Sequence, residues 1–244
     1  KAMTKTIVLI HGYGFDHRSW YPVELAFEGF QMISLTLPGF GEDTVTEPYS
    51  IASLAKSFWA HLDLFGLSSV HLVGHSMGGY VCMEMIAQQP LRVASLGLIH
   101  SHVYPDSPEK KQQRSATIEQ IRLNGRDGVV RRIIPSLFAP GLVGNEIIGS
   151  LVRRGLGYSD NAWMFGAEAM RDRSDHSVTL INLKVPVLMV GGEKDAAVPL
   201  EWMLQQAAFP ERNTLYIYPG VGHMAMYENT AIFARDLIRF YQAL

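Results

Sequence analysis

Continuous apolar runs alternate with amphipathic segments along the first hundred residues. Uninterrupted runs of aliphatic and β-branched residues predict strands of a parallel sheet that is covered on both faces. Segments with apolar residues three and four positions apart predict helices that pack on one side. The predicted strands are residues 6–10, 31–37, 70–73 and 93–99, and the predicted helices are residues 19–27, 50–62 and 81–87.

The alternation stops near residue 101. No strand-like run occurs from 101 to 183, and helices are predicted there over 108–123, 128–137, 145–156 and 160–170. Strands at 185–191 and 215–218 and helices at 200–208 and 228–241 then resume the pattern. We therefore predict an α/β fold with a mostly parallel sheet and helices on both faces. Residues 1–100 and 184–244 form its core, and residues 101–183 form a helical cap insertion.

A Gly-x-Ser-x-Gly turn joins the third predicted strand to its helix, with Ser76 between Gly74 and Gly78. This strand–turn–helix context is that of a nucleophile elbow, in which the glycines remove Cβ atoms that would collide where strand and helix approach. A phosphate-binding loop is the structural alternative, but the Gly-x-x-x-x-Gly-Lys-Ser/Thr pattern is missing.

A serine nucleophile needs a base, and the base needs an orienting carboxylate. Asp195 follows the strand at 185–191, and His223 follows the strand at 215–218. Parallel strands bring these loops to the same sheet edge as Ser76. Glu193 is the alternative carboxylate, and we prefer Asp195.

The order Ser76, Asp195, His223 resembles that of the α/β-hydrolase superfamily, in its capped branch of small esterases, enol-lactonases and C–C hydrolases. The resemblance implies that Ser76 attacks a carbonyl carbon, that His223 transfers the proton and that Asp195 holds the imidazole. It also implies an oxyanion hole made by the backbone N–H groups of Tyr13 and Met77. The Gly192 to Asp195 spacing favours Asp195 as the carboxylate.

Aromatic side chains of the insertion and of the loop after the first strand are candidates for an apolar substrate pocket: Phe15, Phe138, Trp163 and Phe165. The alternative is that they only bury the cap helices against the core. Lys110, Lys111 and Arg114 are predicted to form a solvated helix face.

Several histidines lie near these loops. We expect His11 and His75 to hydrogen-bond loop backbone, and whether His100 and His102 face the pocket stays open.

The composition narrows the partners to a small-molecule substrate. A net charge of -2 favours neither nucleic acid nor an anionic membrane. The single cysteine, Cys82, rules out an internal disulfide, and no compact metal-ligand motif occurs, so we expect no metal and no cofactor. No apolar run reaches membrane-spanning length, and we expect a cytoplasmic monomer or homodimer.

The N-terminus departs from the family pattern. Relatives carry about fifteen residues of strand or hairpin before the His-Gly strand, whereas nine residues precede Ile10 here, so we expect the N-terminal strands to be truncated.

The function that these features favour is a serine hydrolase that cleaves a small, largely apolar ester or lactone through an acyl-enzyme. C–C bond hydrolysis beside a ketone, hydrolysis of an acyl-carrier ester, and a slow-turnover receptor for a small ligand remain alternatives. Dehalogenase and epoxide hydrolase chemistry are disfavoured because those enzymes use an aspartate where Ser76 stands.

Overall fold

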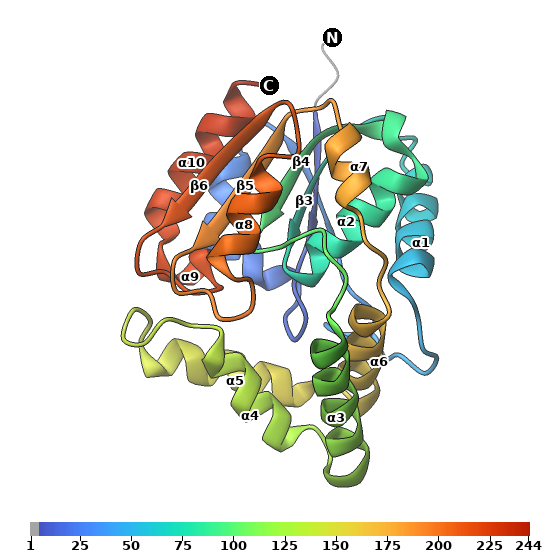
Figure 1. Ribbon diagram of the computed structural model, residues 1–244, viewed down its shortest axis with the longest axis vertical. Helices are drawn as coiled ribbons and strands as arrows, with labels where there is room; N and C mark the ends of the chain where they lie inside the picture. Colours follow the sequence, from blue (N-terminus) through green and yellow to red (C-terminus); the bar gives the residue numbers. More distant parts are fainter. Residues whose placement is uncertain (1–4) are drawn as a thin grey trace.

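A six-stranded sheet forms the centre of the computed structural model, which describes residues 5–244 (Figure 1). All pairings are parallel, in the order β2-β1-β3-β4-β5-β6. The strands are β1 (Thr6–Ile10), β2 (Gln31–Leu35), β3 (Val70–His75), β4 (Val93–Ile99), β5 (Val187–Gly192) and β6 (Asn213–Tyr218). Strands β1, β3 and β5 are buried along their whole length, as their apolar sequences predict. The predicted parallel α/β fold is confirmed.

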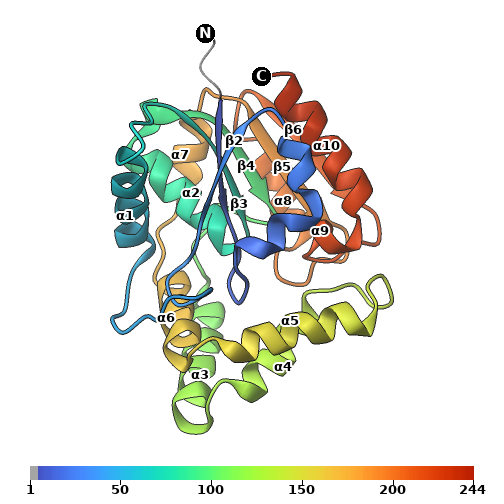
Figure 2. The ribbon, with the colours of Figure 1, turned by 180° about the vertical axis from the view of Figure 1, so that it is seen from behind.

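Helices cover both faces of the sheet (Figures 1 and 2). One face carries α1 (Ile51–Asp63), α2 (Met77–Gln88), α7 (Ser177–Asn182) and α8 (Leu200–Ala207), and the other carries η1 (His17–Phe27) and α10 (Thr230–Gln242). Two short helices, η2 (Pro90–Arg92) and α9 (Ala225–Glu228), complete the core. Within residues 5–244, no helix has both the length and the apolar character needed to cross a membrane.

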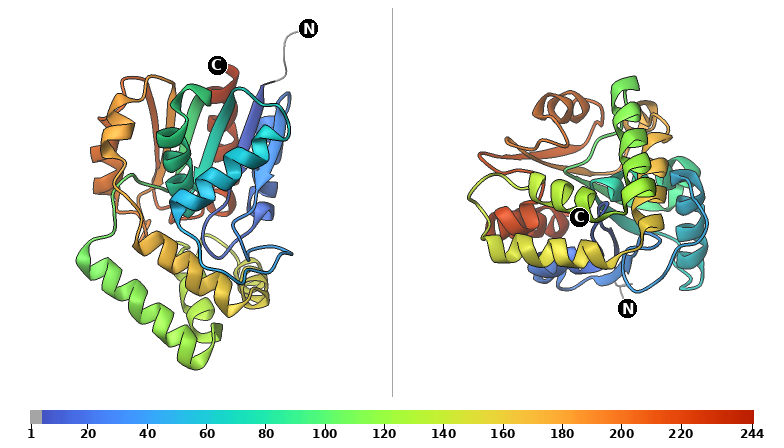
Figure 3. Two further views of the ribbon diagram at one scale, coloured as in Figure 1. Left: turned by 90° about the vertical axis from the view of Figure 1, so that its right-hand side faces the viewer. Right: turned by 90° about the horizontal axis from the view of Figure 1, so that it is seen from below.

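Four helices lie beyond the carboxyl ends of the strands, where both views of Figure 3 place them across one end of the sheet. They are α3 (Pro108–Asn124), α4 (Asp127–Ser136), α5 (Asn145–Gly157) and α6 (Asp160–Arg171). Ser107 and Ser159 accept backbone N–H groups at the starts of α3 and α6, which explains where these helices begin. Each predicted start and end of these four helices lies within one residue of the observed one.

The core departs from the predicted elements in three places. Strand β2 ends at Leu35 because the N–H of Leu37 bonds the ring of His11 instead of a strand, at 3.0 Å. The helix predicted over 228–241 is divided at Asn229 into α9 and α10. The six-residue helix α7 was not predicted, and it lies beside α2, although the predicted cap range includes it. The prediction that strands preceding β1 are truncated lies outside the described residues.

A buried carboxylate fastens the cap to the core. Asp16 accepts the Tyr158 hydroxyl at 2.5 Å and the Arg18 guanidinium at 2.5 Å. Burial alone would raise the pKa of Asp16, but its bonds to Arg18 and Tyr158 outweigh burial and hold that pKa well below its usual value. A second link runs from the Tyr13 hydroxyl to the carbonyl of Trp163, at 2.6 Å. These bonds fix the cap over the strand ends.

Candidate active site

Ser76 stands at the turn between β3 and α2 in a conformation that non-glycine residues rarely adopt, with φ 51° and ψ −117°. A Cβ on Gly74 would lie 2.4 Å from backbone atoms of Gly78 and Gly79, and a Cβ on Gly78 would lie 2.2 Å from the carbonyl oxygen of Ile10. Both positions therefore require glycine, for the steric reason that the motif predicts.

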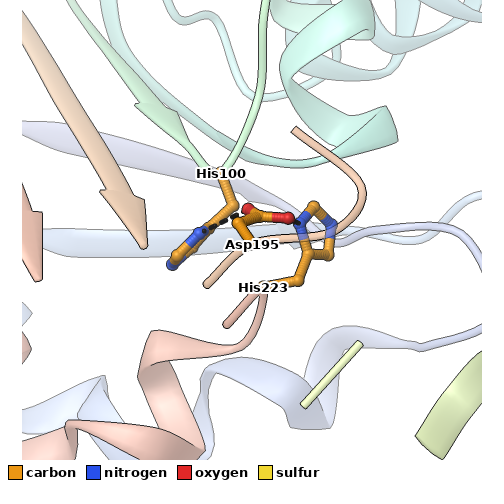
Figure 4. A group of neighbouring side chains, drawn as sticks. All are labelled: His100, Asp195 and His223. Atoms are coloured by element: carbon orange, nitrogen blue, oxygen red, sulfur yellow. Dashed lines mark hydrogen bonds and ion pairs between the residues drawn. The ribbon is translucent and has the colours of Figure 1, made fainter. Parts of the chain in front are cut away.

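Asp195 lies against His223 at the ends of β5 and β6 (Figure 4). The Nδ1 atom of His223 is 2.8 Å from one carboxylate oxygen and 3.0 Å from the other. The backbone N–H groups of Ala197 and Val198 donate to the same carboxylate, at 2.8 and 2.9 Å. The structure thus brings Asp195 to His223, whereas Glu193 accepts the N–H of Gly220 on the surface.

A second histidine shares the Asp195 carboxylate. The Nδ1 atom of His100 lies 3.0 Å from Asp195, on the side of the carboxylate away from His223 (Figure 4). The Nε2 atom of His100 accepts the N–H of Ala225 at 3.4 Å, so the proton lies on Nδ1 and points to Asp195. Burial would raise the pKa of Asp195, but the electrostatic interaction with His223 and the hydrogen bonds of both rings hold it well below its usual value.

The carboxylate of Glu228 organises the loop that carries His223. It accepts the backbone N–H groups of Gly222 at 2.9 Å and Met224 at 2.8 Å, on either side of His223. It also accepts the N–H of Ala139 from the cap at 2.8 Å. The His223 position is therefore coupled to the cap. The sequence left open whether His100 faces the pocket, and neither its contact with Asp195 nor the role of Glu228 was predicted. The only sequence signal for His100 was its place at the end of β4.

Three further histidines near the site, His11, His75 and His102, are buried and bond to backbone or to a neighbouring side chain. His11 bonds the backbone of Gly12 and Leu37, and the Nε2–H of His75 donates to the carbonyl of His223 at 3.0 Å, as predicted. Burial lowers the pKa of His11 to about 4 and places that of His75 well below its usual value, so both rings are neutral near pH 7. His102 bonds the Tyr80 hydroxyl at 3.2 Å.

Ser76 and His223 line one cavity of about 230 Å³ between the sheet edge and the cap. His75 also lines it, whereas neither His100 nor His102 does. Within residues 5–244, no hydrogen bond joins Ser76 to His223; such bonds are often long or poorly aligned before substrate binds. Six of the side chains that line the cavity are large and largely apolar: Phe15, Tyr80, Ile133, Leu137, Met170 and Val198.

The four predicted pocket aromatics have different positions. Phe15 lines the cavity, as expected. Phe138, Trp163 and Phe165 lie outside its wall, so the pocket prediction is corrected for these three residues. Trp163 is fully buried against the ring of Tyr13 and donates its indole N–H to the carbonyl of Gly155 at 3.1 Å, because the cap helices need an apolar core of their own.

The prediction of a solvated face on α3 fails for Arg114, whose side chain is 16% exposed and lines the cavity. Lys110 also lines the cavity but is exposed, as predicted. The guanidinium of Arg114 pairs with Asp106, which also pairs with Arg173 at 2.6 Å. Lys111 is exposed, as predicted. Helix α3 buries only Ile118 and Ile121, so its sequence does not mark which polar side faces the core.

The two predicted oxyanion donors lie next to Ser76. Tyr13 lines the cavity from the loop after β1, and Met77 is the first residue of α2. The first N–H groups of a helix have no partner within it, and the positive end of the helix dipole lies there. The N–H of Met77, at the start of α2, therefore remains a candidate donor to a developing negative charge.

One group of described residues has the spacing that a metal site requires. The potential ligand atoms of its members, His100, Asp195 and His223, lie within 4.8 Å of one another. Both Nδ1 atoms lie 2.8 to 3.0 Å from the carboxylate oxygens, and Nε2 of His100 accepts a backbone N–H. A metal would have to replace the protons that these hydrogen bonds use. The donor set therefore fits a hydrogen-bonded carboxylate better than a metal ion.

Comparison with known proteins agrees with this geometry. The family model described as alpha/beta hydrolase fold matches residues 5–230. A thermophilic esterase from Thermogutta terrifontis, solved with malate bound, superposes with a TM-score of 0.91 at 26% identity, covering 98% of this chain and 90% of that one.

Two curated relatives come from Pseudomonas putida. The dihydrolipoyllysine-residue acetyltransferase component of the acetoin cleaving system is 29% identical over 241 residues, which is 96% of this chain and 62% of that protein. The chain thus spans about three fifths of that relative. The 2-hydroxy-6-oxononadienedioate/2-hydroxy-6-oxononatrienedioate hydrolase 2 is 25% identical over 98% of this chain and 88% of that protein. The chain belongs to the alpha/beta hydrolase fold family.

Proposed function

We propose that this protein is a serine hydrolase that cleaves a small, largely apolar carboxylic ester or lactone through an acyl-enzyme. The observation that carries the proposal is the strained Ser76 elbow in the same cavity as His223, whose ring is held by Asp195. Family membership and the resemblance to an esterase support the same reaction class.

In the proposed first step, the Ser76 oxygen attacks the substrate carbonyl carbon while Nε2 of His223 takes the serine proton. This assignment follows from the Nδ1 proton of His223, which donates to Asp195 and leaves Nε2 free as the base. The tetrahedral intermediate collapses when His223 returns the proton to the leaving oxygen. Water then attacks the acyl-enzyme by the same route and releases the acid.

The backbone N–H groups of Tyr13 and Met77 stabilise the oxyanion in this mechanism. A donor of this kind contributes about 3 to 4 kcal/mol to the transition state, or roughly a hundred- to a thousandfold in rate. The cavity of about 230 Å³ admits a small acyl group, and its apolar lining residues favour a hydrocarbon chain on the substrate.

The test is pre-steady-state kinetics with short and medium-chain 4-nitrophenyl esters on the wild type and on Ser76→Ala. We expect a nitrophenolate burst followed by steady turnover in the wild type, and a loss of at least about a thousandfold in Ser76→Ala. Ser57→Ala, at an exposed position of α1, is the matched control and should keep full activity. Full turnover by Ser76→Ala would refute the proposal.

C–C bond hydrolysis is the second candidate, favoured by the resemblance to the oxononadienedioate hydrolase. The same Ser76 and His223 would then act on a ketone carbon, with a stabilised carbanion as leaving group. The two reactions are separated by measuring kcat/KM for a vinylogous diketone and for an ester of equal length. A larger kcat/KM for the diketone would favour C–C cleavage.

A further inference from the structure

The inner side of α3 carries polar and positively charged residues. Lys110, Gln113, Arg114 and Thr117 are spaced by three and four positions, so they share one side of the helix. All four line a second hollow of about 180 Å³, which is also bounded by Arg132 of α4 and Ala167 of α6. Lys110 and Arg114 line both this hollow and the cavity beside Ser76. The two spaces therefore meet at these cations.

The positive charges there exceed the negative ones. Asp106 is the carboxylate in contact with Arg114, and it also pairs with Arg173, so one negative charge faces two guanidinium groups. Among residues 5–244, the Lys110 ammonium has no ion-pair partner, and Arg132 donates to the neutral amide oxygen of Gln120 at 3.1 Å. None of the described residues that line the cavity beside Ser76 or the second hollow is acidic.

This positive surplus favours an anion in the hollow. Lys110 and Arg114 are like charges one helical turn apart, an arrangement that destabilises a helix. The Lys110 side chain is exposed, and partial desolvation together with the charge of Arg114 lowers the pKa of its ammonium. A negatively charged group between the two side chains would remove the repulsion. Guanidinium and ammonium groups also recognise carboxylates through charge-assisted hydrogen bonds.

We propose that Lys110, Arg114 and Arg132 form a subsite for a carboxylate of the substrate, so that the molecule cleaved at Ser76 has an anionic far end. The inference rests on the proposed serine hydrolase function and narrows its substrate class. In this arrangement an apolar segment of the substrate would contact Ile133 and Leu137 in the cavity, and its carboxylate would contact Lys110 and Arg114, where the two hollows meet.

The test compares two esters that differ only in the charge of the far end: mono-(4-nitrophenyl) adipate and its methyl ester. Nitrophenolate release reports cleavage of the same bond in both. We expect the wild type to favour the free acid by about tenfold or more in kcat/KM, and the preference to shrink between about 0.05 and 0.5 M salt. Lys110→Met and Arg132→Met should each lower the preference about three- to tenfold.

Lys111→Met is the matched control, since Lys111 neighbours Lys110 but lines neither hollow, and it should keep the full preference. Calorimetric binding of adipate provides a readout that needs no turnover: the wild type should bind it, and Lys110→Glu should weaken binding at least about tenfold.

Equal kcat/KM for the two esters, or adipate binding that Lys110→Glu leaves intact, would overturn the carboxylate subsite. In that case, loss of neutral-ester turnover in Ser76→Ala would still support the serine hydrolase. If Ser76→Ala retained turnover while adipate binding depended on Lys110, the proposed reaction would fail and the subsite would stand. The two proposals therefore fail separately.

Discussion

Gly78 is the position where a single methyl group tests the active-site geometry most directly. It lies in the first turn of α2, and a Cβ there would be 2.2 Å from the Ile10 oxygen and 2.7 Å from the His11 oxygen. An ordinary contact begins at 3.4 Å, so Gly78→Ala requires α2 and the end of β1 to separate by about 1 Å. That movement shifts Ser76 and Met77 away from the loop of Tyr13.

Misplacement of reacting groups by about 1 Å costs roughly a hundredfold in rate, which corresponds to about 2.7 kcal/mol. The free energy of unfolding should fall less, because overpacking costs about 1 to 3 kcal/mol while alanine gains about 1 kcal/mol of helix propensity over glycine. We therefore expect kcat on a 4-nitrophenyl ester to fall about a hundredfold in a protein that remains folded.

The assay pairs kcat with urea unfolding of the same preparations. Gly157→Ala is the matched control: it is also helical, its Cβ would meet no atom within 4 Å, and its φ is not positive. It should keep full activity and equal or higher stability. A Gly78→Ala enzyme with kcat within about threefold of the wild type would refute the link between elbow packing and oxyanion geometry.

Two further predictions concern buried polar groups. His100→Leu should lower kcat about tenfold, because it removes one of the hydrogen bonds that hold the Asp195 carboxylate. His100→Asn retains a donor and tolerates the φ of 47°, so it should restore much of this loss, and an equal kcat in both variants would contradict this. Asp16→Asn should cost about 1 to 3 kcal/mol near pH 7, since it removes the charged partner of Arg18 and Arg154, whose side chains are partly exposed. The pKa of Asp16 is lower in the folded than in the unfolded chain, so its contribution is complete above about pH 4 and is lost as pH falls through the folded pKa. Urea unfolding across this range should show a smaller acid-side loss for Asp16→Asn than for the wild type.

The sequence alone determined the parallel sheet, because strands buried on both faces must be apolar throughout, as β1 and β5 are. It also located Ser76, Asp195 and His223 at one sheet edge, since the carboxyl ends of parallel strands meet there. The glycines of the elbow were readable for a similar reason: local backbone sterics depend on neighbours in the chain.

Only the tertiary structure decided which polar groups meet across long stretches of chain. His100 and Asp195 are 95 positions apart, and Ala139 and Glu228 are 89 apart, so no local pattern marks either contact. The side of α3 that faces the cavity was equally hidden, because its two buried isoleucines form no apolar stripe that orients the helix. Apolar periodicity reports what is buried, whereas a polar side chain is placed by partners that folding brings from elsewhere in the chain.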